Sequence, residues 1–61
     1  MLTVRERLDE IRNLKNQKDW VHADMQADEL YERSTQDIEM TDEEFMELCL
    51  YMDVISSHVL P

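Results

Sequence analysis

The sequence predicts an all-α fold: two or three short amphipathic helices, arranged as a helical hairpin or a three-helix bundle, in one small domain over residues 1–61. Three observations lead to this prediction. The chain has no glycine and a single proline, which leaves little composition for the tight turns that β-hairpins need. Apolar residues recur at intervals of three and four, as they do along one side of an α-helix. Two capping-box patterns mark helix starts.

The first helix is predicted over about residues 3–17. Thr3 and Glu6 stand three apart, as the two partners of a capping box do. The apolar stripe that follows consists of Val4, Leu8, Ile11 and Leu14. Polar residues at 16–18 interrupt this stripe, and Asp19 is a good N-cap for what comes next. A turn is therefore favoured over one continuous helix, although no residue in the stretch forces a break.

The second helix is predicted over about residues 19–34. Its apolar stripe consists of Ala23, Ala27, Leu30 and Tyr31, with Val21 and Met25 on an adjoining line. The side chains of residues 34–37 are Ser, Thr, Gln and Asp, which compete with the helix for local backbone hydrogen bonds. We expect this polar stretch to connect the second helix to the third.

The third helix is predicted over about residues 41–59, and its start is the best defined in the chain. Thr41 and Glu44 repeat the capping-box spacing. Asp42 and Glu43 follow the cap, where carboxylates interact favourably with the positive end of the helix dipole. Two apolar stripes run along this helix: Phe45, Leu48, Met52 and Ile55 on one, and Met46, Leu50 and Val54 on the other.

The apolar arc of the third helix is wider than a lone surface helix needs, so it requires two neighbours. The first two helices could cover both sides, but their own stripes are narrow and rich in alanine. A domain of this size also buries only about 60% of its unfolded surface and is marginal alone. We therefore expect a homodimer whose interface includes the third helix, and we assign self-association to Phe45, Leu48, Met52 and Ile55.

The charge of the chain is strongly negative and unevenly distributed. Six basic residues stand against 15 acidic ones, for a net charge of −9. Residues 1–18 carry a net +2, whereas residues 19–61 carry −11 because Arg33 is their only basic residue. The excess of anions argues against direct nucleic-acid binding, which requires cations that displace counterions. A direct DNA contact through the basic residues of the first helix is a minor alternative.

Nothing in the sequence predicts a membrane protein or a secreted one. No stretch approaches the roughly 18 apolar residues of a membrane span, and the opening residues lack the apolar segment of a secretion signal. Cys49 is the only cysteine, so no disulfide can form within the chain. This pattern is typical of a reducing compartment, and we expect a cytoplasmic protein.

An acidic face is the strongest functional candidate. We assign to it Asp24, Asp28, Glu29, Glu32, Asp42, Glu43 and Glu47. Such a surface predicts a non-enzymatic protein–protein interaction module that binds an unidentified partner, for which a basic surface is the complementary chemistry. A more specific alternative is a DNA-mimic inhibitor that occupies the cationic groove of a DNA-handling protein. The plain alternative is a face that only keeps the protein in solution.

The sequence predicts no catalytic, cofactor-binding or metal-ligating residue. Glu43, Glu44 and Glu47 could gather Mg²⁺ in a small metal-dependent hydrolase, but no second acidic pair follows them, and the helix dipole already explains acids here. His22, His58 and Cys49 match no compact zinc spacing. Cys49 lies between Leu48 and Leu50, so we expect it to be buried and unreactive.

The chain as a whole resembles the short acidic accessory proteins encoded in the early regions of temperate lambdoid phages. The resemblance depends on the opening TVRERLDEIRNLK at residues 3–15 and the closing helix TDEEFMELCLYMDVISSHVLP at residues 41–61. It implies an early-expressed regulator or inhibitor without catalytic activity that acts on a host protein. No position matches a defined site of such a family, so the resemblance assigns no functional residue.

Overall fold

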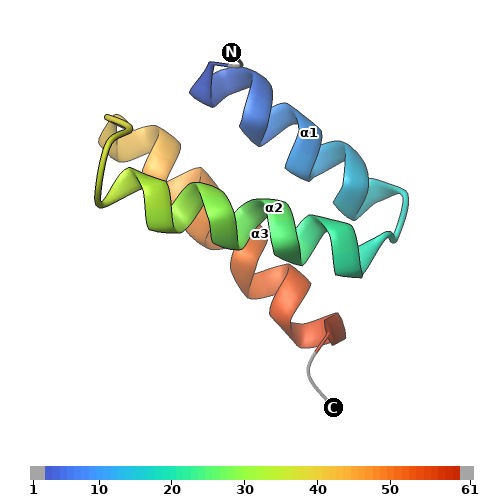
Figure 1. The fold of residues 1–61 in the computed structure, drawn as a ribbon. Coiled ribbons are helices and arrows are strands. Elements are labelled where there is room, and N and C mark those ends of the chain that lie inside the picture. The colour runs from blue at the N-terminus through green and yellow to red at the C-terminus, as the bar shows by residue number, and fades with distance from the viewer. Residues whose placement is uncertain (1–2, 60–61) are drawn as a thin grey trace.

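The computed structural model describes residues 3–59, which form three helices: α1 (Val4–Asn16), α2 (Trp20–Ser34) and α3 (Asp42–Val59) (Figure 1). No strand occurs within these residues. α2 runs back antiparallel to α1, and α3 crosses behind α2 in the same general direction as α1. Each helix packs against the other two. The predicted all-α fold is confirmed, and of its two arrangements the chain adopts the three-helix bundle.

Local hydrogen bonds set both ends of α1. The Thr3 hydroxyl accepts from the Glu6 amide at 3.2 Å, and the Glu6 carboxylate accepts from the Thr3 amide at 3.4 Å, so the predicted capping box is present. At the other end Lys18 has φ 62°, in the left-handed region. The amide of Asp19 donates to the Leu14 carbonyl at 3.0 Å, the bond of a Schellman motif. The chain therefore turns between α1 and α2 without a glycine.

The start of α2 differs from the prediction in one respect. Asp19 occupies the N-cap position, but its side chain makes no hydrogen bond to the helix amides. Its carboxylate instead lies 2.7 Å from Nδ1 of His22. The reason is the backbone of Asp19, whose ψ of 71° departs from the extended conformation in which a cap side chain reaches back to the helix.

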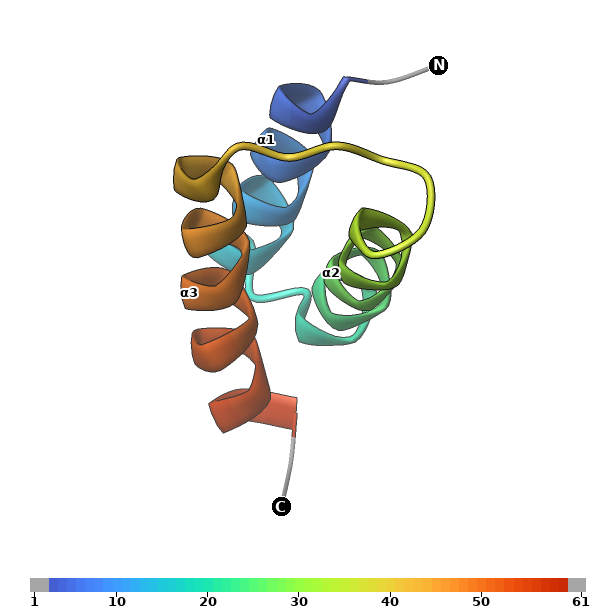
Figure 2. The ribbon, with the colours of Figure 1, turned by 90° about the vertical axis from the view of Figure 1, so that its left-hand side faces the viewer.

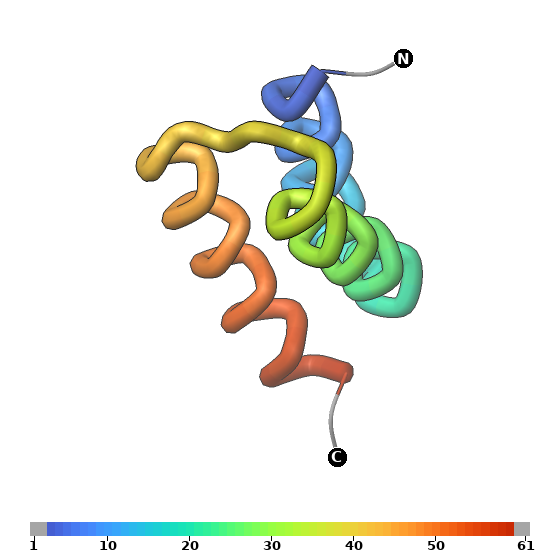
Figure 3. Tube along the Cα trace, turned by 60° about the vertical axis from the view of Figure 1, so that its left-hand side comes forward, coloured from blue at the N-terminus to red at the C-terminus, as the bar shows by residue number. Residues whose placement is uncertain are grey.

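The start of α3 follows the sequence closely. The Thr41 hydroxyl accepts from the Glu44 amide at 3.1 Å, and the Glu44 carboxylate accepts from the Thr41 amide at 3.0 Å. The connection from α2 to α3, residues 35–41, crosses the end of the bundle near the start of α1 (Figures 2 and 3). This long crossing lets α3 lie against α1 and α2 together.

One hydrophobic core holds the three helices together, and each helix contributes to it. Its fully buried members are Leu8, Ile11, Ala23, Ala27, Leu30, Leu48 and Ile55. The two alanines lie on α2, where small side chains let the neighbouring helices approach closely. Each buried leucine or isoleucine contributes about 1.5–3 kcal/mol through removal of apolar surface from water. The stripe predicted for α1 therefore does face the core, and so do Ala23, Ala27 and Leu30 of the stripe predicted for α2. Tyr31, also predicted for the α2 stripe, is 40% exposed, and Val21 and Met25 on the adjoining line face away from the core.

The prediction that one stripe of α3 forms the dimer interface is wrong for two of its four residues, Leu48 and Ile55. Leu48 and Ile55 have 0% exposed surface within the single chain, because α1 and α2 cover them. Phe45 and Met52 are half-buried. The first two helices thus provide both neighbours that α3 requires, and this stripe is not available to a second copy in this fold.

Candidate interaction faces

A row of three carboxylates runs along the outward side of α2. Asp24, Asp28 and Glu32 stand four residues apart, which places them on one side of the helix with a rise of about 6 Å from each to the next. Asp28 and Glu32 are exposed, and Asp24 is half-buried. Within residues 3–59, none of the three forms an ion pair. We call these three residues the α2 acidic row.

Glu29, also predicted for the acidic face, lies beside this row with its charge partly offset. Its carboxylate is 3.9 Å from Nη1 of Arg33, one turn later on α2. Arg33 also approaches Asp37, in the connection to α3, at 3.5 Å. Arg33 is the only arginine in residues 19–61, and no lysine occurs in that range. Because Arg33 pairs with Glu29 and Asp37, it forms no ion pair with the α2 acidic row in the described part of the chain.

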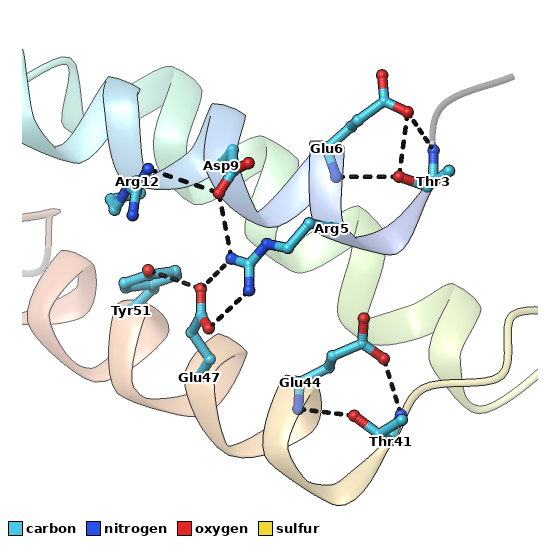
Figure 4. A network of polar contacts seen from close by, with 9 residues as sticks. All are labelled: Thr3, Arg5, Glu6, Asp9, Arg12, Thr41, Glu44, Glu47 and Tyr51. Carbon is cyan, nitrogen blue, oxygen red and sulfur yellow. Dashed lines mark hydrogen bonds and ion pairs between the residues drawn. The ribbon is translucent and has the colours of Figure 1, made fainter.

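Glu47 does not belong to the free acidic face, which corrects its assignment from the sequence. The two terminal nitrogens of the Arg5 guanidinium on α1, Nη1 and Nη2, donate to its carboxylate, and the Tyr51 hydroxyl donates to the same group at 2.8 Å (Figure 4). Arg5 also pairs with Asp9 at 3.2 Å, and Asp9 with Arg12 at 3.6 Å. These contacts join α3 to α1, and they neutralise the charge of Glu47 with a cation of the same chain.

The pKa values within this cluster change in the directions that its contacts require. The hydrogen bonds from Arg5, and then that from Tyr51, lower the pKa of Glu47 because they stabilise its charged form. Partial burial raises the pKa of Tyr51, and the bond to Glu47 raises it further. The carboxylate also raises the pKa of Arg5. The cluster is a structural link between α1 and α3, and its contacts favour the ionised form of Glu47.

Asp42 and Glu43 lie exposed in the first turn of α3, as predicted. Their neighbour Glu44 is engaged in the capping box with Thr41. Two of the three glutamates that could have gathered Mg²⁺ are thus engaged within the chain, Glu44 with Thr41 and Glu47 with Arg5. Within the described part of the chain, no group of three or more His, Cys, Asp or Glu side chains is placed to hold a metal ion.

The histidines and the cysteine lie in different environments. The ring of His58 near the end of α3 stacks on Trp20 at the start of α2, with ring centroids 4.0 Å apart and planes 3° from parallel. His22 lies beside Asp19. Cys49 is exposed, so its predicted burial is wrong. The reason is its position on α3, a quarter turn away from the buried Leu48.

The second apolar stripe of α3 faces away from the core. Met46 and Leu50 are each 65% exposed, and Val54 is 42% exposed. A shallow hollow of about 530 Å³ lies on this side of the helix. Its lining is Phe45, Met46, Cys49, Leu50 and Asp53. We call Met46, Leu50 and Val54 the α3 apolar row; the stripe is visible in the sequence, but only the packing shows that it points outward.

Comparisons of this chain with protein-family models, with curated proteins and with solved structures found no significant match. None of the helices within residues 3–59 is long and apolar enough to cross a membrane. The resemblance to phage early-region proteins accordingly stays a prediction from the sequence. A functional assignment therefore depends on two features of the structure: the α2 acidic row, whose carboxylates form no ion pair within residues 3–59, and the exposed α3 apolar row.

Proposed function

We propose that this protein is a non-enzymatic interaction module that binds a basic surface of a partner protein through the α2 acidic row, with Asp42 and Glu43 as further acidic contacts. The observation that supports the proposal is the row itself. Carboxylates four residues apart on a helix repel one another, and each such pair costs a few tenths of a kcal/mol. Asp24, Asp28 and Glu32 make two such pairs in succession with no ion pair to offset them within residues 3–59.

The biological role that fits this module is regulation or inhibition of the partner, as the resemblance to phage early-region proteins implies. A row of anions gives rapid association with a cationic surface and selects against acidic partners. The single cysteine fits a reducing compartment, so we place this binding in the cytoplasm.

Affinity capture with two matched variants tests this function. Tagged protein is incubated with nuclease-treated cell lysate and eluted with increasing salt. Asp28→Asn/Glu32→Gln removes two charges from the α2 acidic row, and Glu10→Gln/Glu39→Gln removes two exposed charges elsewhere. We expect a partner that is released at moderate salt, is lost with the first variant and is retained by the second. Equal retention by both variants would contradict the proposal.

The even spacing of the α2 acidic row favours one more specific function, inhibition by DNA mimicry. A regular line of carboxylates can occupy a groove that normally receives a line of phosphates. The same capture identifies it, because the partner would then be a DNA-binding protein that duplex DNA displaces from the column. A captured partner that duplex DNA leaves in place would exclude the mimic and retain the general function.

A further inference from the structure

The packing of the bundle leaves the α3 apolar row uncovered, with Met46 and Leu50 each 65% exposed and Val54 42% exposed. Scattered exposed apolar residues are normal on protein surfaces, but a line of them along one side of a helix is a common feature of docking sites. Met46, Leu50 and Val54 stand four residues apart, and Met46 and Leu50 also line the shallow hollow. An occupant therefore needs its own line of apolar side chains at helical spacing.

The charges around this row define the occupant further. Asp53 lines the hollow, and Asp42 and Glu43 lie at the first turn of the same helix. No lysine or arginine occurs in the chain after Arg33. α3 itself therefore carries aspartate and glutamate but no lysine or arginine, and the Arg5 guanidinium that reaches it from α1 is already bound to Glu47. Cations beside the apolar residues of an occupant would complement the free carboxylates of α3.

From these two features we propose that α3 is the docking site for a basic amphipathic helix of a partner protein. A helix fits because the site is itself a helix of 18 residues, along which a second helix can place apolar side chains at intervals of three and four. The antiparallel direction is favoured. Lysines or arginines in the last turn of the partner helix would then lie beside Asp42 and Glu43 and would also complement the partner's own dipole.

A second copy of this chain is a poorer occupant of the same face. Each copy carries a charge of −9, and the segment that would form the contact contains no lysine or arginine. Pairing α3 with α3 would bring together two helices that carry aspartate and glutamate but no lysine or arginine, whereas a basic helix would supply the opposite charge. The inference deepens the proposed function, since it names the partner's chemistry and a second contact surface.

The test uses a synthetic probe, so it does not depend on identifying the natural partner. The probe is a labelled 18-residue peptide with leucines at helical spacing, flanked by lysines and with lysines in its last turn, matching α3 in length. A control peptide has the same composition in an order that destroys the apolar stripe. Binding is followed by fluorescence anisotropy at low and at physiological salt.

Two protein variants with the same chemistry locate the binding. Met46→Gln/Leu50→Gln changes the α3 apolar row, and Val21→Gln/Met25→Gln changes a pair on α2 that is also four apart and exposed by 64% and 62%. We expect the first variant to weaken binding of the amphipathic peptide by about tenfold or more, because it removes two central apolar contacts. The second variant should change the affinity by less than about twofold.

Three results would overturn the proposal. One is equal affinity for both peptides, which would show attraction by charge alone; another is absence of binding at peptide concentrations of about 1 mM. The third is a dimer in sedimentation equilibrium that Met46→Gln/Leu50→Gln dissociates, which would assign this face to a second copy. If one of these results occurred but Asp28→Asn/Glu32→Gln still abolished capture from lysate, the proposal for α3 would be wrong and the proposed function of the α2 acidic row would be retained.

Discussion

At the scale of single residues, Glu47 shows how a distant partner changes what a charged side chain does. By sequence it is one of four acids at the start of α3, and nothing nearby distinguishes it from Glu43. In the folded chain it accepts hydrogen bonds from Arg5, 42 positions away, and from Tyr51. Its charge therefore contributes to the packing of α1 on α3 rather than to binding a partner.

This contact predicts a pH dependence of stability. The pKa of Glu47 is lower in the folded state than its ordinary value of 4.5. Its stabilising contribution is therefore fully present above the unfolded pKa and is lost as pH falls through the lower folded pKa. Glu47→Gln should lower the melting temperature at pH 7 by roughly 2–4 °C. The difference from the unmodified protein should shrink below about pH 4.

Thermal melts followed by circular dichroism at pH 7 and pH 3 check this prediction. Glu10→Gln, on the exposed side of α1, controls for the loss of one negative charge without an interhelical contact. If Glu47→Gln and Glu10→Gln gave the same melting temperature at pH 7, the contact with Arg5 would not stabilise the protein.

At the scale of elements, the end of α1 carries the clearest local strain. Lys18 occupies the C′ position of the Schellman motif with a φ of 62°, a conformation that costs about 1 kcal/mol or more for a residue with a Cβ atom. Glycine, which adopts it freely, is absent from the chain. The turn forms nevertheless, because the stripes of α1 and α2 share one core.

Replacing this lysine by glycine should stabilise the protein. We expect Lys18→Gly to raise the free energy of unfolding by about 0.5–1 kcal/mol, since relief of strain exceeds the added entropy of the unfolded chain. Urea denaturation measures the difference. Lys18→Gln removes the charge but keeps the Cβ atom, so it should remain close to the unmodified protein. A glycine variant no more stable than the glutamine variant would contradict a left-handed residue at position 18.

At the scale of the whole molecule, the two stripes of α3 have opposite roles. α1 and α2 bury Leu48 completely, whereas Leu50, only two residues later, is 65% exposed. Two residues correspond to about 200° around a helix, so neighbouring apolar positions reach opposite sides. The width of the apolar arc therefore reflects one side that forms the core and another that we assign to a partner.

Two alanine substitutions separate these roles. Leu48→Ala should destabilise the protein by about 2–5 kcal/mol, as expected for a cavity in a packed core. Leu50→Ala should change the free energy of unfolding by less than about 0.5 kcal/mol. Urea denaturation at two protein concentrations gives both values and shows whether stability depends on association. If Leu48→Ala prevents folding, the smaller change Ile55→Val should still cost about 0.5–1.5 kcal/mol. Equal effects at Leu48 and Leu50 would contradict the described packing.

Much of the fold follows from the sequence because it depends on contacts within one or two helical turns. The capping boxes of Thr3 and Thr41 join residues three apart, and both are present. The stripes of α1 and α2 follow the helical period directly. Asp19 is the local exception, because a cap requires a backbone angle that the preceding turn does not provide.

The sequence by itself determined the helical class, two helix starts and the concentration of negative charge after residue 18, and it favoured three helices over two. Only the tertiary structure decided which stripe of α3 is buried, that Cys49 is exposed and that Glu47 is bound to Arg5. The physical reason is the range of the interactions. Helix periodicity and capping act over a few residues, whereas burial and ion pairing depend on where a distant helix lies.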